Sequence, residues 1–457
     1  MAEKLNATLR SSKRSWQQLA GTGRSADIVG ASLAQACARL VSLLVPLITM
    51  PWTVTYLGQE RFGIWMAASS IVLLISLVEG GVSSALVTAT SRAHAIGDFQ
   101  RIRHLIASAF ALLIPVAIGF LAVVALIAIW TDWASLFKIK STIGAAEAPQ
   151  VFFTIAAITA ISFFVNVGTM VRTGLQQIPL VSLWEVLGKL IALPALAIAI
   201  MLKMGTPWLV GALFGVPIVI SGIGVIQFFA SNPVYRPRLY DASWEYSRGL
   251  LHGGGAFTAA TFAYLIAISS DQFLIAAIVS ADAVTSYSIL SRLFAIPFLL
   301  TSFVFFAQWP AYASSMARGD EIWVFRSFYR TLVAAIAFSL LLTLILIGFL
   351  EKILDLWMGQ DIHTPALLVW GMGIYAVLSV AEAAIRHLLF ALDARKELIG
   401  ISVAMVLINV PLTIVLLHSI GVAGAVLATD IAYFCCIIIP SAAIICRRLL
   451  RYASEYK

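Results

Sequence analysis

Nine ionisable side chains lie inside the long apolar stretches of this sequence. A charged residue in the middle of a membrane-spanning helix is costly unless it faces water or a partner. Such residues therefore mark either ion pairs that fix helices or groups that contact a charged ligand or ion. They are Arg39, Glu79, Glu185, Lys189, Asp271, Arg292, Glu382, Arg386 and Asp430.

Two pairs among these residues are spaced four apart, which places both side chains of a pair on one face of a helix. Glu185 precedes Lys189 in this way, and Glu382 precedes Arg386. Each pair either neutralises itself and fixes its helix, or offers charge to a cavity. The spacing alone is compatible with both interpretations.

Asp271 and Arg292 lie on either side of a predicted hairpin turn near residues 280–282. At about 1.5 Å per residue, both side chains are roughly 12 to 14 Å from that turn. They form either a structural ion pair or a carboxylate and a cation that line a cavity.

Arg39 and Asp430 have no counter-charge nearby in the sequence. Arg39 lies well inside the first apolar stretch and is the main candidate for a cation in a cavity. Asp430 is predicted either to bind a coupling ion or to pair with Arg39 or Lys189 from another helix. An unpaired ionisable residue in a span is a functional hypothesis by default.

Twelve apolar stretches must position these residues. Of the 457 residues, 61% are hydrophobic and 11% are charged, whereas a soluble domain carries about 25% charged residues. Since about 20 apolar residues span a bilayer, we predict an all-α polytopic membrane protein with twelve transmembrane helices. Their ranges are 27–51, 62–87, 105–130, 150–171, 180–202, 208–230, 252–279, 283–308, 330–350, 366–390, 398–417 and 422–446.

The distribution of Lys and Arg predicts the orientation. With the N-terminus in the cytoplasm, the cytoplasmic segments hold 21 basic residues and the exterior loops hold 5. This bias predicts that both termini are cytoplasmic. It also explains the net charge of +8, so we expect membrane lipids and no nucleic acid as partners. The polar N-terminus has no signal-peptide pattern.

The chain divides into two predicted six-helix halves around a central cavity. The segments are a basic tail at 1–26, a half at 27–230, a linker at 231–251, a half at 252–446 and a basic tail at 447–457. The linker is predicted to hold a short surface helix with Trp244 and Tyr246 at the level of the lipid headgroups. Repeats of this kind place a substrate site between them, near the middle of the membrane.

No cysteine or histidine pattern indicates a metal, a disulfide framework or a cofactor. The four cysteines, Cys37, Cys435, Cys436 and Cys446, lie in or at the ends of spans. The longest predicted exterior loop, Thr131–Gln150, lacks an acid–base or nucleophile constellation. The sequence therefore argues against an enzyme such as a polysaccharide polymerase or ligase.

Two groups of motifs resemble the bacterial oligosaccharide flippase family, which is the polysaccharide branch of the multidrug/oligosaccharidyl-lipid/polysaccharide exporter superfamily. The resemblance runs from about residue 25 to 446. Where the family more often has Asp-Leu-Gly, this chain has Glu79-Gly80-Gly81. The matching segments are Tyr56-Leu57-Gly58, Phe62-Gly63-Ile64-Trp65, Asp271-Gln272-Phe273-Leu274-Ile275, Tyr287 and Ser291-Arg292-Leu293.

This resemblance implies a carrier of the bacterial inner membrane that moves undecaprenyl-diphosphate-linked oligosaccharides to the outer leaflet for surface polysaccharide biosynthesis. Arg39 would then hold the anionic head, because a guanidinium offers forked donors to phosphate. The alternative is a cation-coupled multidrug exporter of the same superfamily. The buried charges, four basic and five acidic, do not separate the two, and the motifs favour the flippase.

Overall fold

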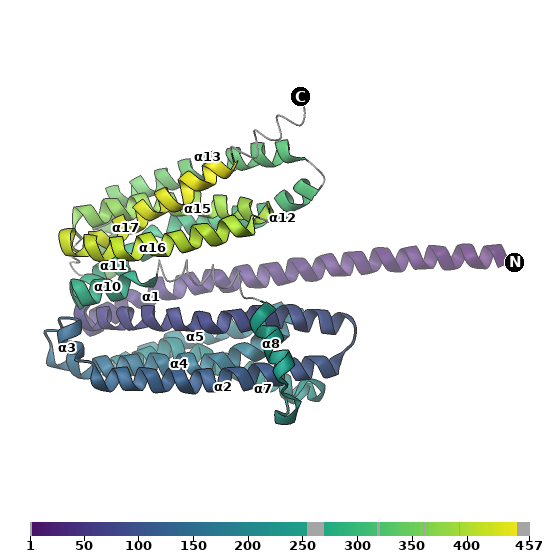
Figure 1. The fold of residues 1–457 in the computed structure, drawn as a ribbon, viewed down its shortest axis with the longest axis horizontal. Coiled ribbons are helices and arrows are strands. Elements are labelled where there is room, and N and C mark those ends of the chain that lie inside the picture. The colour runs from purple at the N-terminus through teal and green to yellow at the C-terminus, as the bar shows by residue number, and fades with distance from the viewer. Residues whose placement is uncertain are drawn as a thin grey trace.

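The computed structural model describes the backbone of residues 2–253, 269–317, 320–359, 362, 364–392 and 394–445. All regular elements in these residues are helices (Figure 1). Ten of the helices described are long and apolar enough to cross a membrane. The prediction of an all-α polytopic membrane protein is confirmed.

The helices follow one another with short connections. The first half contains α1 (Ala2–Ala95), α2 (Phe99–Trp130), α3 (Trp133–Leu136), α4 (Thr142–Gly174), α5 (Ile178–Met201), α6 (Thr206–Val210) and α7 (Val216–Ser231). The linker holds α8 (Trp244–Gly253). The second half contains α10 (Asp271–Ile278), α11 (Ala281–Phe294), α12 (Ile296–Ala317), α13 (Glu321–Gly348), α14 (Leu350–Met358), α15 (Ala366–Ala391), α16 (Arg395–Ile420) and α17 (Ala423–Ala432).

Helix α1 covers the first two predicted spans, because it turns back on itself at Gly58 (Figure 1). The backbone there has φ 78° and ψ 168°, a conformation that only glycine adopts without strain. The seventh predicted span, 252–279, falls largely on residues 254–268, which lie outside the described part of the chain. The number of twelve spans therefore stays a prediction.

The loop predicted at Thr131–Gln150 is mostly helical, which corrects the sequence analysis. Helix α4 begins at Thr142 rather than near residue 150. Ser141 caps it, since the Ser141 hydroxyl accepts a hydrogen bond from the Gly144 amide at 3.0 Å. Polar residues in its first turns made the segment resemble a loop. One of these polar residues, Glu147, lies in the helix and forms an ion pair with Arg61 of α1.

The helices form two groups that meet at one end and diverge toward the other (Figure 1). We call the end that holds Gly58, α3 and Ser280 the closed end. The end that holds α8 and the turn at Gly97 is the open end. The largest cluster of buried apolar side chains includes residues of both halves, whereas a second cluster of described residues, among them Phe305 and Leu388, lies within the second half.

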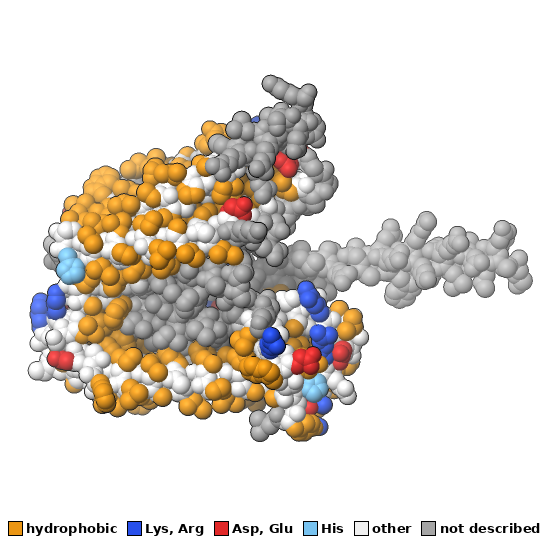
Figure 2. Space-filling view, viewed as in Figure 1, with side chains coloured by type: hydrophobic (Ala, Val, Ile, Leu, Met, Phe, Trp, Pro, Cys, Tyr) orange, Lys and Arg blue, Asp and Glu red, His pale blue; other side chains and the backbone are white. Residues whose placement is uncertain are grey.

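The outer faces of the helices suit a lipid environment. Large apolar side chains are exposed there: Ile129 is 77% exposed, Leu341 is 61% exposed and Leu407 is 69% exposed. Hydrophobic side chains cover much of the visible surface of both halves, while charged side chains gather at the ends of the helices, most of them near α8 (Figure 2). Exposed apolar area on this scale indicates contact with lipid rather than water.

The linker is docked on α2 at the open end. Arg103 forms an ion pair with Asp241 at 2.8 Å, and the His104 ring stacks on Tyr246 at 5.5 Å. The predicted short helix exists as α8, and Trp244 is 73% exposed at its start. Tyr246 is turned toward α2, so of the two predicted headgroup residues only Trp244 faces outward.

Candidate functional site

Arg39 is exposed on the face of α1 that is turned away from the apolar stripe of that helix. Leu40, Leu44, Ile48 and Trp52 are exposed at a spacing of four residues, which defines one side of the helix. With 3.6 residues per turn, Arg39 projects from roughly the opposite side. The apolar stripe therefore suits lipid, and Arg39 suits a polar space inside the protein.

Lys189 and Glu185 form the ion pair that their spacing predicts, at 2.5 Å between Nζ and Oε1. The Lys189 ammonium also donates to the Ser42 hydroxyl. Ser42 lies three residues after Arg39, on the same side of α1. The side chain of Glu185 is 46% exposed and that of Lys189 is 23% exposed. Ser42 and this pair thus form a polar contact between α1 and α5, three residues along α1 from Arg39.

Arg292 is the one exposed residue of α11, a 14-residue helix that the structure describes throughout. The other residues of α11 are buried or partly buried, so protein surrounds this helix on all sides. An exposed arginine on such a helix faces a solvent-accessible space within the protein. Arg292 of the second half and Arg39 of the first half are thus both exposed cations within predicted spans.

Asp271 does not form the direct ion pair with Arg292 that the sequence analysis considered. Its carboxylate accepts a hydrogen bond from the Tyr287 hydroxyl at 2.8 Å, and the Thr429 hydroxyl lies 3.4 Å from the same oxygen. The Asp271 side chain is buried at 2% exposure, whereas Arg292 is exposed. Burial separates the two groups even though both lie at similar distances from the hairpin turn.

Asp430 is buried at 6% exposure, and neither carboxylate oxygen has a hydrogen-bond partner among the residues that the structure describes. It pairs with neither Lys189, which pairs with Glu185, nor any other described cation. Asp430 follows Thr429 directly, so the two buried carboxylates, Asp271 and Asp430, belong to one polar cluster. Tyr287 interacts electrostatically with both carboxylates.

The same cluster contains oxygen atoms that the sequence analysis did not identify. The Asn409 amide donates to the Thr429 hydroxyl at 2.9 Å. Five buried oxygens of the cluster and its surroundings lack a hydrogen-bond partner in the described part of the chain: Oδ1 of Asp271, both carboxylate oxygens of Asp430, Oδ1 of Asn409 and Oγ1 of Thr413. Asn409 and Thr413 are polar residues one helical turn apart within an apolar run, and this pattern could have indicated the cluster from the sequence.

The two carboxylates in this set require protons or a cation. Burying an ionised carboxylate without compensation is strongly unfavourable. Carboxylate, amide and hydroxyl oxygens are the ligands that hard cations prefer. A π-helical segment, Tyr433–Ile438, directly follows α17, and irregularities of this kind are frequent at functional sites. The cluster at Asp271 and Asp430 is the candidate site for a coupling cation or proton.

The second pair predicted from spacing, Glu382 and Arg386, is also an ion pair in α15. Glu382 is buried, and the side chain of Arg386 is 30% exposed. The side chain of Glu79 lies outside the described part of the chain. We therefore assign the Glu382–Arg386 pair to helix packing.

The two halves are joined at the closed end by backbone and side-chain contacts. The Phe137 ring meets Phe273 edge-on, with 5.8 Å between ring centroids. Among the described residues at this end, three hydrogen bonds join the halves: Thr285 Oγ1 to the Gln59 carbonyl at 2.5 Å, the Ala281 amide to the Phe137 carbonyl at 3.3 Å, and Lys138 Nζ to the Ile278 carbonyl at 2.5 Å. Access from this end is therefore obstructed by the paired halves.

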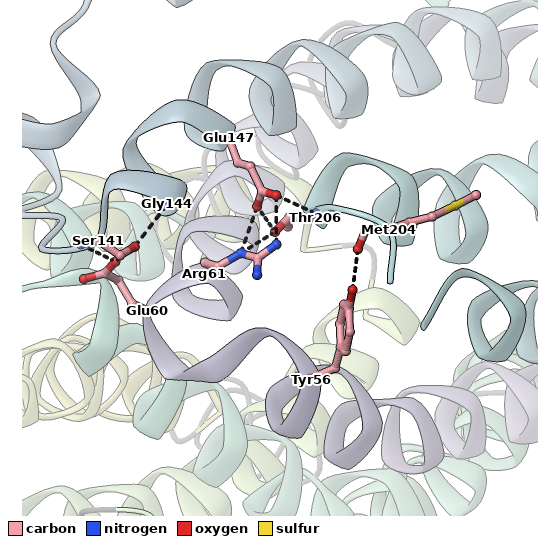
Figure 3. Close-up of polar contacts among 8 residues, drawn as sticks. All are labelled: Tyr56, Glu60, Arg61, Ser141, Gly144, Glu147, Met204 and Thr206. Carbon is pink, nitrogen blue, oxygen red and sulfur yellow. Dashed lines mark hydrogen bonds and ion pairs between the residues drawn. The ribbon is translucent and has the colours of Figure 1, made fainter. Parts of the chain in front are cut away.

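Within the first half, a polar cluster fastens the α1 turn to its neighbours (Figure 3). The Arg61 guanidinium faces Glu147 at 2.8 Å, and Thr206 donates to the same carboxylate. The adjacent Glu60 points to the other side and accepts from Ser141 and the Lys140 amide. These contacts hold the first half rigid at the closed end.

The family model for polysaccharide biosynthesis proteins matches residues 32–316. The chain belongs to this family. No curated protein matches the chain. The fold is shared with a structure of a multidrug resistance MATE family transporter of the MOP superfamily in an inward-facing conformation, at TM-score 0.74 and 13% identity, with 91% of this chain and 98% of that chain covered.

Two further solved structures share this fold with the family member. The lipid II flippase MurJ in an inward closed conformation matches at TM-score 0.67 and 14% identity, with 91% of this chain and 87% of that chain covered. A MOP superfamily transporter from Pyrococcus furiosus matches at TM-score 0.57 and 12% identity, with 92% and 95% covered. The family is therefore one of polysaccharide biosynthesis proteins, and the fold is the one seen in these transporter structures.

Gly63 allows the polysaccharide biosynthesis family member to close this end. A Cβ atom at Gly63 would lie 1.8 Å from the Ala281 carbonyl oxygen. We expect Gly63→Leu to hold the closed end apart and to stop transport, because the backbone of α11 cannot move aside within a packed helix pair. Labelling of a cysteine introduced at Val284, which is buried, measures the opening. Gly119→Leu is the control, since that glycine has nothing within 4 Å. Unchanged labelling in Gly63→Leu would contradict the prediction.

Proposed function

We propose that this protein carries a lipid-linked oligosaccharide with a diphosphate head across the bacterial cytoplasmic membrane by alternating access. The family supports a role in polysaccharide biosynthesis, and one relative in fold is a lipid II flippase. The observation that carries the proposal is the exposure of Arg292 on a helix that is otherwise enclosed. With Arg39, it gives the space between the halves a cation from each side.

The distribution of exposed and buried charges favours an anionic cargo. Among the described span residues, Arg39 and Arg292 are exposed, and the self-neutralising Glu185–Lys189 pair is partly exposed. The acids Asp271 and Asp430 are buried in the second half. The exposed Arg292 therefore offers a positive charge to a cargo, which favours a diphosphate over the cationic drugs of a multidrug exporter. Two arginines present planar forks that match phosphate oxygens.

The buried cluster at Asp271 and Asp430 supplies the coupling step in this proposal. A cation or proton would neutralise the carboxylates in one conformation and leave in the other. When the ion leaves, the buried Asp430 carboxylate is charged and its burial becomes unfavourable. The binding free energy of the ion is therefore linked to the position of α17, which carries Asp430. Undecaprenyl diphosphate is the lipid carrier that the family resemblance implies.

The open end faces the cytoplasm in this scheme. The basic residues favour that side, and one relative in fold is described as inward-facing. The cargo would enter from the inner leaflet between the divergent ends of the halves. It would leave on the far side after the closed end separates.

A transport assay with defined substrates tests the function. Purified protein in vesicles receives a fluorescent undecaprenyl-diphosphate oligosaccharide in one leaflet, and appearance in the other leaflet is followed with a membrane-impermeant quencher. We expect flipping that rises with a sodium or proton gradient. Efflux of cationic dyes without flipping of the lipid-linked sugar would instead support the multidrug exporter.

A fusion experiment tests the orientation. A phosphatase that is active only outside the cytoplasm should give no signal when fused after Lys457, because the basic-residue bias places both termini inside. The matched control ends the chain at Lys203, in the turn between α5 and α6 at the closed end, and should be active. An active, intact fusion at residue 457 would overturn the topology.

A further inference from the structure

Helix α14 lies between α13 and α15 and connects the second half to α1 of the first half. Leu350, Leu354 and Met358 are buried at a spacing of four residues, so one face of this helix packs into the core shared by the halves. Leu356 is 91% exposed on another face. The helix is only nine residues long, too short to span a bilayer. It is therefore held by packing and by one specific contact.

That contact is a hydrogen bond between the halves. The indole Nε1 of Trp357 donates to the backbone carbonyl of Leu47 in α1 at 2.7 Å. A carbonyl in the middle of an α-helix normally accepts from the amide four residues later. For Leu47 that residue is Pro51, which has no amide hydrogen. The proline thus leaves an acceptor open, and Trp357 from the other half fills it.

This bond lies at a different level from the other contacts between the halves. Gln59, which accepts from Thr285 at the closed end, is 12 residues after Leu47. Leu47 lies 11 residues before the turn at Gly58, so at 1.5 Å per residue the two attachments are roughly 16 Å apart along α1. Two separated attachments resist tilting of one half against the other better than one attachment does.

We propose that Trp357 is a positioning residue that latches α14 to the carbonyl exposed by Pro51, and so sets how readily the closed end opens. This inference rests on the proposed alternating-access function, because opening of the closed end requires the latch to break. Within the membrane, a carbonyl without a partner is costly. In the open state the Leu47 carbonyl must therefore accept a hydrogen bond from water or from another donor. The bond to Trp357 thus stabilises the closed state relative to the open state.

Two substitutions remove the same bond by different routes. Trp357→Phe keeps an aromatic ring but loses the N–H donor. Pro51→Ala restores an amide, so the Leu47 carbonyl regains its partner within the helix and no longer needs Trp357. We expect each variant to increase the open fraction of the closed end about fivefold, the change produced by losing one hydrogen bond of ordinary strength. The double variant should equal either single variant, because both remove one interaction.

Spin-label distances measure the open fraction without any substrate. In a background with the native cysteines replaced by serine, labels at Ile143→Cys and Ser419→Cys report the separation of the halves. Both positions are exposed at the closed end, on α4 and α16. A new population at longer distance is the expected result for Trp357→Phe and Pro51→Ala.

Matched controls are Trp370→Phe, which changes an exposed tryptophan of α15, and Pro115→Ala, which changes a proline inside α2. Both should leave the distances unchanged. Distances in Trp357→Phe and Pro51→Ala that equal those of the parent, or additive effects in the double variant, would overturn the latch. If Trp357→Phe fails to fold, Pro51→Ala still carries the test. Because the readout needs no cargo, a failed flipping assay with shifted distances would refute the proposed substrate and leave the latch intact.

Discussion

Arg39→Ala is expected to reduce flipping of the lipid-linked oligosaccharide by about tenfold or more, while the protein still inserts and accumulates. Arg39 lies on the polar side of α1, opposite the apolar stripe that suits lipid. A charge-assisted contact to a phosphate, lost from a site of low dielectric, costs at least a factor of ten. Initial flipping rates at matched protein amounts measure the effect.

Arg39→Lys separates charge from geometry in the same assay. Lysine keeps the positive charge but loses the planar fork, so we expect it to retain part of the activity. Arg101→Ala is the matched control, since Arg101 is exposed at the start of α2. Normal flipping by Arg39→Ala would refute the role in cargo binding. Loss of folded protein in both Arg39 variants would assign the residue to packing instead.

Asp430→Asn is expected to abolish the dependence of flipping on a cation or proton gradient. The substitution removes the charge and keeps the shape of a side chain whose two carboxylate oxygens are buried without a hydrogen-bond partner among the described residues. The thermal stability should be unchanged or higher, because an uncompensated buried charge is unfavourable. Flipping in vesicles should fall by about tenfold or more, as expected for loss of the coupling site.

Rates measured with and without sodium and proton gradients distinguish coupling from a structural defect. Glu245→Gln, which changes an exposed acid of α8, is the control and should respond to the gradients as the parent does. A fully gradient-dependent Asp430→Asn protein would exclude this carboxylate from coupling. Reduced stability together with reduced flipping would indicate that Asp430 is needed for the fold.

Hydropathy and spacing were sufficient for several features. Continuous apolar stretches permit only helices in a membrane, because each backbone amide and carbonyl must be paired within the segment. The i,i+4 spacing likewise predicted the Glu185–Lys189 and Glu382–Arg386 pairs, since neighbours on one helical face meet whatever surrounds them. The turn between the first two predicted spans, 27–51 and 62–87, falls at Gly58, where the backbone has a positive φ.

Contacts between distant segments could not be predicted in the same way. Equal distances from a turn allowed either an ion pair between Asp271 and Arg292 or two separate groups lining a cavity, because the rotation of each helix decides which side a residue faces. That rotation directs Asp271 to Tyr287 and Thr429 and leaves Arg292 exposed. The polar start of α4 was similarly mistaken for a loop, because its partner Arg61 lies 86 residues away.

The sequence by itself determined that this protein is a bundle of membrane helices with ionisable residues in its spans, because the bilayer restricts the backbone and periodicity fixes neighbours on one helix. The tertiary structure decided which charges are exposed to the interior and which are buried. It brought Asp271, Asn409 and Asp430 into one cluster and joined Trp357 to Leu47. Those outcomes depend on how the helices pack against one another. The shapes of the side chains decide this packing, and the spacing of residues along the sequence does not.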